Sequence, residues 1–143
     1  MKFGHVALRV KNIQKVLDFY CRGLGFSEAF RILNDDGSLR IVYLHISQKQ
    51  YLELCLGGGK RPVFDDAKSV GFRHLCFIVD DLANTKKELE EKGIAFDSEI
   101  LTLRDRNLTA YLFDPDGNKI ELVELQPGSP HKEFEKKKAS WGE

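Results

Sequence analysis

The sequence predicts an α+β fold made of two tandem modules, each with the element order β-α-β-β-β. Two observations predict it: the spacing of apolar residues changes in the same order along both halves, and the halves align at a nearly constant offset. Phe3-x-His5 matches Phe72-x-His74 at an offset of 69, and Leu52-Glu53-Leu54 matches Ile120-Glu121-Leu122 at an offset of 68. A tandem duplication of one unit is the simplest explanation of these matches.

In the first module, alternation of apolar residues over His5–Val10 predicts a strand. Apolar residues from 13 to 20 then follow the spacing of an amphipathic helix, with Asn12 as its expected N-cap and Gly23 as a stop signal. Turn residues separate the segments that follow. Three further strands are predicted at residues 27–33, 39–46 and 51–56.

The second module repeats this order. Alternation over Phe72–Val79 predicts a strand, and the next apolar spacing predicts a helix from Leu82 to Gly93, capped by Asp80 or Asp81. The stretch Asp114–Gly117 predicts a tight turn, because its proline presets φ and its glycine accepts a positive φ. Strands are predicted at residues 95–100, 109–113 and 119–125.

These elements define the expected domain organisation. We expect one domain over residues 1–126, with modules at 1–59 and 70–126 and a polar linker at 60–69 that shows no sustained period. Residues 127–143 are expected to form a polar, solvated tail, with Lys136–Lys138 facing the solvent.

The composition limits the classes of function. With 143 residues, 42% hydrophobic content and 22 basic against 22 acidic side chains, the chain resembles an ordinary soluble domain with no nucleic-acid footprint. The longest apolar run, about five residues, is too short to span a membrane, and the N-terminal residues do not resemble a signal peptide. Three isolated cysteines indicate neither a disulfide framework nor a thiolate zinc site, so we expect a protein of the reducing cytoplasm.

Strand alternation places the chemically active side chains on one face. If Val6, Leu8 and Val10 pack into the core, then His5, Ala7 and Arg9 point the other way. The same parity places four polar side chains, His5, Glu53, His74 and Glu121, on the inner face of a curved sheet, together with Cys55 and Cys76. A single strand histidine is more often structural, and small cysteines are common core residues. The repetition of the His and Glu pair in both halves favours a functional role.

The four side chains suit a metal ion. A carboxylate withdrawn from water needs a partner, and two imidazoles with two carboxylates favour a borderline divalent cation such as Zn²⁺, Ni²⁺, Co²⁺, Fe²⁺ or Mn²⁺. An octahedral site of this kind would keep two positions for water or a chelating substrate.

The sequence resembles the glyoxalase, or vicinal oxygen chelate, superfamily over residues 3 to 125. The resemblance implies a glyoxalase/bleomycin resistance/dioxygenase fold, in which paired modules form a cupped, barrel-like mixed sheet around a metal. It rests on five segments: the strand His5–Val10, the helix residues Asp18-Phe19-Tyr20 with Gly23–Phe26, the strand Leu52-Glu53-Leu54, Phe72-x-His74, and Phe113–Leu122.

Within this superfamily, the order His5, Glu53, His74, Glu121 is similar to the metal ligands of the lactoylglutathione lyases. The resemblance implies one divalent ion per site, with Zn, Ni or Co favoured over Mn or Fe, and an isomerisation through an enediolate of a hemithioacetal. Glu121 and Glu53 would be the catalytic carboxylates, with the choice of base open. Arg9 would bind a substrate carboxylate, with glutathione as the implied cosubstrate, although a salt bridge is an equal alternative for Arg9. A small-molecule substrate and a homodimer are also implied.

Other functions remain open within the same fold. An epimerase would carry Gln where Glu53 stands, and an iron-dependent dioxygenase normally uses two histidines and one carboxylate, so Glu53 argues against both. A metal-free protein that binds small molecules or antibiotics would have lost the ligand positions, and four retained residues argue against it. The residues do not decide whether one chain or two chains form each site.

Overall fold

The computed structural model describes residues 1–60, 68 and 70–140, and its chain divides into two compact units, Met1–Val70 and Gly71–Glu143. Each unit contains one four-stranded mixed sheet, and helices are few, so the fold class is α+β as the sequence predicts. The predicted linker at 60–69 lies largely outside the described residues.

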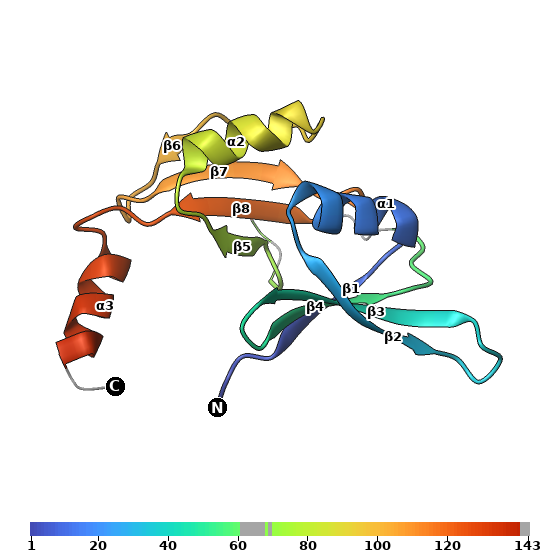
Figure 1. The fold of residues 1–143 in the computed structure, drawn as a ribbon. Helices are drawn as coiled ribbons and strands as arrows, with labels where there is room; N and C mark the ends of the chain where they lie inside the picture. The colour runs from blue at the N-terminus through green and yellow to red at the C-terminus, as the bar shows by residue number, and fades with distance from the viewer. Residues whose placement is uncertain (61–67, 69, 141–143) are drawn as a thin grey trace. The chain divides into compact units, whose positions relative to one another are not determined.

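Unit 1 has the spatial strand order β1-β4-β3-β2 (Figure 1). Strand β1 runs parallel to β4, while β3 is antiparallel to both β4 and β2. The connection from β1 to β2 contains α1 and η1 and crosses from one edge of the sheet to the other, where a helical crossover is the usual solution. The elements are β1 (His5–Arg9), α1 (Ile13–Leu17), η1 (Asp18–Gly23), β2 (Ser27–Leu33), β3 (Leu39–Ser47) and β4 (Gln50–Cys55).

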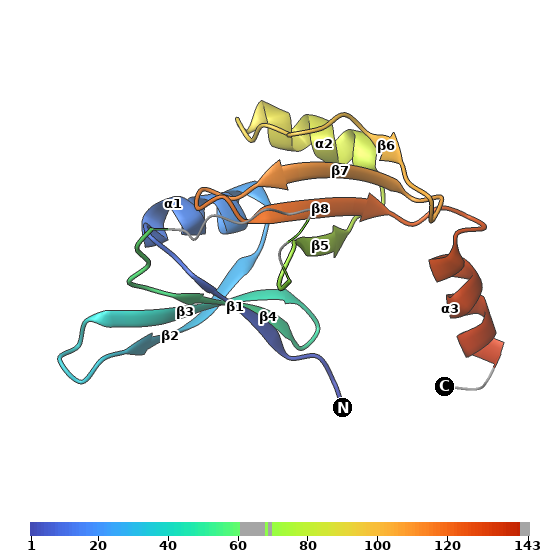
Figure 2. The ribbon, with the colours of Figure 1, turned by 180° about the vertical axis from the view of Figure 1, so that it is seen from behind.

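Unit 2 repeats this topology with the order β5-β8-β7-β6, and helix α2 covers one face of its sheet (Figure 2). Strand β5 is parallel to β8, and β7 is antiparallel to β8 and β6. The duplication that the sequence predicts is therefore present in the strand pairing. The elements are β5 (Leu75–Ile78), α2 (Leu82–Glu91), β6 (Leu101–Thr102), β7 (Leu108–Phe113), β8 (Lys119–Glu124) and α3 (Pro130–Ser140).

Burial follows the strand alternation. In β1, Leu8 is buried while His5 and Arg9 are exposed, and in β4 both Leu52 and Leu54 are fully buried on either side of Glu53. The same pattern in β8 buries Ile120 and Leu122 and leaves Glu121 partly exposed. Because one face of each sheet is apolar, the register is fixed, and the polar side chains are held on the other face.

The predicted helix caps are confirmed. The side chain of Asn12 accepts a hydrogen bond from the Lys15 backbone N–H at 3.2 Å, and Asp81 accepts one from Asn84 at 2.8 Å. The first helix nevertheless changes from α to π geometry at Asp18.

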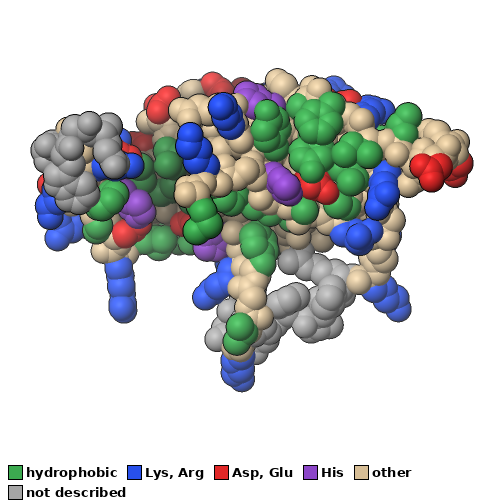
Figure 3. Space-filling view, turned by 90° about the horizontal axis from the view of Figure 1, so that it is seen from below, with side chains coloured by type: hydrophobic (Ala, Val, Ile, Leu, Met, Phe, Trp, Pro, Cys, Tyr) green, Lys and Arg blue, Asp and Glu red, His purple; other side chains and the backbone are tan. Residues whose placement is uncertain are grey.

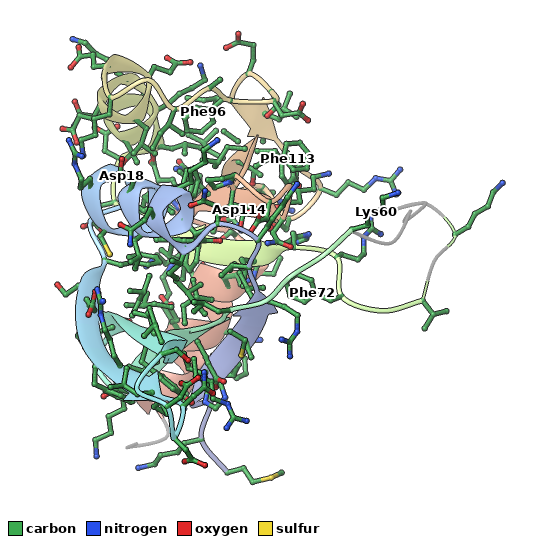
Figure 4. All side chains as sticks on the ribbon, turned by 90° about the vertical axis from the view of Figure 1, so that its right-hand side faces the viewer. Asp18, Lys60, Phe72, Phe96, Phe113 and Asp114 are labelled. Carbon is green, nitrogen blue, oxygen red and sulfur yellow. The ribbon has the colours of Figure 1, made fainter. Side chains whose placement is uncertain are left out.

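The strand predicted at 95–100 is wrong, because Phe96 forms only an isolated bridge with Leu112 of β7, and β6 begins later. Phe96, labelled in Figure 4, also contacts α2, because the Lys86 ammonium lies 5.2 Å from the centroid of its ring.

The solvated tail also contains an element that the sequence analysis did not predict. Helix α3 begins after Ser129, whose hydroxyl accepts a hydrogen bond from the Lys132 N–H at 3.3 Å, and Pro130 occupies the first turn, where no N–H is needed. Lys136–Lys138 are exposed on α3, as expected. Among the described residues, no helix is long and apolar enough to cross a membrane.

Candidate metal centre

The first half of the candidate site lies on three adjacent strands of unit 1. Glu53 on β4 is in register with Ala7 on β1 and with Tyr43 on β3. His5 Nε2 lies 3.1 Å from Glu53 Oε2, and the Tyr43 hydroxyl donates a hydrogen bond to the same oxygen at 2.5 Å. The other carboxylate oxygen, Oε1, accepts a hydrogen bond from Cys55 Sγ at 3.2 Å.

The second half lies at the matching positions of unit 2. Glu121 on β8 is in register with Tyr111 on β7 and Cys76 on β5, while His74 directly precedes β5. His74 Nε2 lies 3.0 Å from Glu121 Oε2. The Tyr111 hydroxyl donates to the opposite oxygen, Oε1, at 3.3 Å. The same three side-chain types therefore meet in both units.

The two glutamates are largely withdrawn from solvent and the two histidines are more open. The side chains of Glu53 and Glu121 are 12% and 14% exposed, against 46% for His5 and 33% for His74. Histidine side chains reach the surface beside acidic and hydrophobic ones in Figure 3. An ion or substrate approaching either pair would meet the imidazole and one edge of the carboxylate.

The contacts between the tyrosine hydroxyls and the glutamates shift pKa values in both units. The hydrogen bond from Tyr43 holds the pKa of Glu53 below its ordinary value, against the opposing effect of burial, and the same bond raises the pKa of Tyr43. In unit 2, burial is the main cause that raises the pKa of Tyr111, with the charge of Glu121 next.

The thiols beside the glutamates are held in the neutral form. Burial and the neighbouring Glu53 raise the pKa of Cys55, while Arg9 and Arg40 act in the opposite direction. Burial and the charge of Glu121 raise the pKa of the Cys76 thiol to about 12, although the residue keeps some exposed surface. Neither thiol has the lowered pKa of a reactive cysteine. The expectation that both are core residues is wrong for Cys76, which is exposed, while Cys55 is half-buried.

Each half can supply two metal ligands. A neutral imidazole nitrogen and a carboxylate oxygen within 3.1 Å of each other form a donor pair that suits a borderline divalent cation. The residue types present therefore fit the metal that the sequence predicts. Across residues 1–60, 68 and 70–140, no group of three or more His, Cys, Asp or Glu side chains is arranged to hold a metal ion. The two pairs belong to separate compact units.

The tyrosines are functional candidates that the sequence analysis missed. Tyr43 and Tyr111 are separated by 68 residues, the same offset that relates Glu53 to Glu121. Each lies one strand away from its glutamate in an antiparallel pair. The constant offset was a usable signal, because residues that keep one offset through a duplicated unit occupy equivalent places in both copies.

The predicted substrate residue Arg9 lies in a pocket of unit 1 that also contains Glu53. This pocket has a volume of about 510 Å³, and Arg40 and Cys55 are in its lining. One guanidinium nitrogen of Arg9, Nη1, donates to the Leu56 carbonyl at 3.0 Å, which fixes the direction of the side chain.

The family model of the Glyoxalase/Bleomycin resistance protein/Dioxygenase superfamily matches residues 2–122. The chain therefore belongs to this superfamily. Among solved structures, the glyoxalase family protein from Enterococcus faecalis is similar, with a TM-score of 0.71 and 27% identity, covering 86% of this chain and 97% of that chain.

Several curated relatives are lactoylglutathione lyases. A lactoylglutathione lyase of Pseudomonas aeruginosa is 27% identical, covering 85% of this chain and 81% of the relative. A lactoylglutathione lyase of Schizosaccharomyces pombe is 28% identical over 90% of this chain, which spans only 49% of that longer relative. These are distant relationships, and they support the class of protein more firmly than the substrate.

Proposed function

We propose that the chain is a metal-dependent lyase or isomerase of the lactoylglutathione lyase type, which moves a proton between adjacent carbons of a vicinal-oxygen substrate. The observation that carries the proposal is the repeated His, Glu and Tyr arrangement in the two units. A structural ion pair would not require the same three side chains twice, whereas one site assembled from duplicated halves would.

In this proposal His5, Glu53, His74 and Glu121 are the metal ligands. A divalent ion held by them, with Zn, Ni or Co favoured and Mn or Fe as other candidates, would supply Lewis acidity toward two adjacent substrate oxygens and lower the pKa of the neighbouring C–H. Within each pair, the side chains are already 3.0–3.1 Å apart, so little reorganisation is needed.

The contacts favour different roles for the two glutamates. Both oxygens of Glu53 accept hydrogen bonds, from Tyr43 at 2.5 Å and from Cys55 at 3.2 Å, so this carboxylate is held in one orientation. Glu121 also has a hydrogen bond with the Cys76 thiol, but its bond from Tyr111 is longer, at 3.3 Å. A proton-transferring carboxylate has to move between ligand and substrate, so we assign the proton transfer mainly to Glu121 and the fixed ligand role to Glu53.

The cosubstrate and assembly follow from the similarity to lactoylglutathione lyases. We propose glutathione as the thiol, methylglyoxal as the carbonyl compound, and Arg9 as a contact for the glutathione carboxylate. We also propose a homodimer in the cytoplasm that acts on a small molecule.

The first test is metal content. Tag-free protein purified without chelator and reloaded separately with Ni²⁺, Co²⁺, Zn²⁺ and Mn²⁺ is expected to hold about one ion per site by elemental mass spectrometry. His5→Ala and His74→Ala should each lose the ion. His45→Ala is the matched control, because His45 Nε2 is bonded to the Gln48 carbonyl at 2.9 Å and has no carboxylate contact in the described chain. Equal metal content in all variants would remove the proposed mechanism.

A mixing experiment tests the assembly. If each site draws one pair from each of two subunits, combining inactive His5→Ala and His74→Ala chains produces mixed dimers with one intact site. Activity with methylglyoxal and glutathione should then reappear on mixing. No recovery after verified subunit exchange would mean that each chain builds its own site.

A further inference from the structure

We propose that Cys55 and Cys76 are positioning residues, whose thiols set the orientation of Glu53 and Glu121 in the candidate site. The inference rests on the proposed function, because it gives two of the proposed metal ligands a supporting pair of hydrogen-bond donors. The hydrogen bonds themselves require no metal, so they can be tested separately from the reaction.

Each glutamate of the candidate site accepts a hydrogen bond from a thiol. In unit 1, Cys55 Sγ donates to Glu53 Oε1 at 3.2 Å. In unit 2, the Cys76 thiol donates to Glu121. The third cysteine, Cys21 on η1, forms no side-chain hydrogen bond within the described part of the chain. The thiol contacts are therefore confined to the two carboxylates of the candidate site.

The two thiols reach their glutamates from different directions. Cys55 lies on β4, two residues after Glu53 on the same strand. Cys76 lies on β5, in register with Glu121 on the neighbouring strand β8. Side chains two residues apart on a strand share a face, and residues in register on adjacent strands lie side by side. Both positions therefore let a short side chain reach the carboxylate.

The duplication itself does not explain these contacts. The position in unit 2 that is equivalent to Cys55 is Val123, and the position in unit 1 that is equivalent to Cys76 is Ala7. A contact inherited through the duplication would occupy equivalent positions, as the two site tyrosines do. The thiol contact is present in each unit at a position of its own, which favours a requirement of the carboxylates over a shared origin.

Core packing does not explain the exposed thiol. Cys76 is exposed and Cys55 is half-buried, whereas the apolar face of each sheet carries fully buried residues such as Leu54 and Ile120. A small side chain that stays exposed removes little apolar surface from water. The hydrogen bond to Glu121 is the specific interaction that Cys76 makes.

A thiol suits a carboxylate that has to be oriented without being immobilised, because S–H is a weaker donor than O–H. In unit 1 the thiol bonds to Glu53 Oε1, while His5 Nε2 lies 3.1 Å from Oε2, so the two contacts use different oxygens. In unit 2 the donors to Glu121 are the Cys76 thiol and the Tyr111 hydroxyl at 3.3 Å. This weak set of donors fits the carboxylate to which we assign proton transfer.

Infrared spectroscopy of chelator-treated, full-length protein tests the contacts, because the S–H stretching band moves to lower frequency when a thiol donates a hydrogen bond. Cys21→Ala, Cys55→Ala and Cys76→Ala each remove one band and thereby assign all three. Glu121→Gln should shift the Cys76 band, because an amide oxygen is a weaker acceptor than a carboxylate. Glu53→Gln should shift the Cys55 band in the same way, and neither substitution should move the Cys21 band.

Kinetics and metal affinity test the positioning role. Losing a hydrogen bond to a metal ligand usually costs 10- to 100-fold in affinity or activity, and we expect roughly tenfold here. In metal-loaded protein, Cys76→Ala should lower kcat by that factor without changing KM or metal content, whereas Cys55→Ala should weaken metal binding. Cys76→Ser and Cys55→Ser keep a donor and should restore most of each loss. Cys21→Ala is the matched control and should change neither quantity.

The outcomes separate this inference from the proposed function. Cys55 and Cys76 bands that do not respond to the glutamate substitutions would overturn the inference. An active enzyme with unchanged kcat and metal affinity in both alanine variants would also overturn it, and so would equal losses in the alanine and serine variants. Band shifts in a protein that has no activity with any of the metals would support the thiol contacts and remove the proposed reaction.

Discussion

The two units contain the same His, Glu and Tyr side chains, but the hydrogen bond from tyrosine to glutamate is shorter in unit 1 than in unit 2. In unit 1 the tyrosine hydroxyl lies 2.5 Å from the glutamate oxygen that the histidine also contacts, while in unit 2 it lies 3.3 Å from the opposite oxygen. A second difference lies four residues after each histidine. Unit 1 has Arg9 at this position, and unit 2 has Ile78, which is 65% exposed. The duplicated units therefore share the candidate ligands and differ in what surrounds them.

This difference suggests how a duplicated fold becomes an asymmetric site. Two equal halves would treat both ends of a substrate alike. In the proposed site, the more tightly bonded carboxylate of unit 1 would position the substrate, and the carboxylate of unit 2, with its longer tyrosine bond, would move the proton. The predictions below test that division, from the largest expected effect to the smallest.

The largest effect is expected from replacing the loosely held carboxylate. Glu121→Gln removes the group assigned to proton transfer and should lower kcat by roughly 10²–10⁴-fold at saturating metal, the usual contribution of general acid–base catalysis. Glu53→Gln should lower kcat less and weaken metal binding more. Steady-state kinetics with metal content measured on the same samples separates the two effects, and the reverse order would exchange the two roles.

Core substitutions test whether the two sheets are equally important to stability. Leu54 and Leu122 are matched by the repeat, follow their glutamates directly, and are 0% and 2% exposed. Leu54→Ala and Leu122→Ala should each destabilise the fold by about 2–5 kcal/mol in urea unfolding, because each leaves a cavity. Ile78→Ala, at an exposed site, is the control and should change little. A large effect in only one unit would show that the other sheet contributes less to the measured transition.

Replacing each tyrosine tests whether the two hydrogen bonds contribute differently to metal binding. Tyr43→Phe should weaken metal binding about tenfold, the lower end of the usual cost of losing a hydrogen bond to a metal ligand, and Tyr111→Phe should have a smaller effect. Competition with a chelator of known affinity measures both. Tyr51→Phe serves as the control, since its ring contacts Tyr43 and no hydrogen bond of its hydroxyl occurs within the described chain. Equal losses for Tyr43→Phe and Tyr111→Phe would remove the proposed asymmetry.

Much of this arrangement was accessible from the sequence because burial alternates along the strands. Leu52 and Leu54 are buried on either side of Glu53, so the period of two correctly placed the carboxylate on the opposite face. Residues 95–100 defeated the same reasoning, since this stretch forms only one isolated bridge, from Phe96 to Leu112, and the strand begins at Leu101. Ser129 and Pro130 mark the start of helix α3, but the residues that follow are mostly charged and contain one large apolar residue, Phe134, so no apolar spacing predicts the helix.

The asymmetry between the halves was not accessible from the sequence. Tyr43 and Tyr111 are the same residue at the same offset, and only the distances of 2.5 and 3.3 Å distinguish their hydrogen bonds. Those distances depend on sheet twist and neighbouring packing. Tyr43, for example, stacks on Phe30 with ring centroids 4.5 Å apart, and no aromatic residue occupies either the 68 or the 69 offset from Phe30 in the second module.

The smallest expected effect is a pH dependence of stability. Because the Tyr43 hydrogen bond lowers the pKa of Glu53 in the folded protein, the ionised carboxylate stabilises the fold at pH values above its unfolded pKa. That contribution is lost as the pH falls through the lowered, folded pKa. Tyr43→Phe removes the main cause of the shift. The difference in unfolding free energy between parent and variant should therefore be largest near neutral pH and should shrink as the solution becomes acidic.

Urea unfolding of chelator-treated protein over a series of pH values measures this difference, with Tyr111→Phe as the matched variant. A Tyr43→Phe difference that stayed constant with pH would mean that the lost hydroxyl does not act through Glu53 ionisation. In that case the orientation of the Tyr43 ring would be maintained by its stacking on Phe30 rather than by its bond to Glu53.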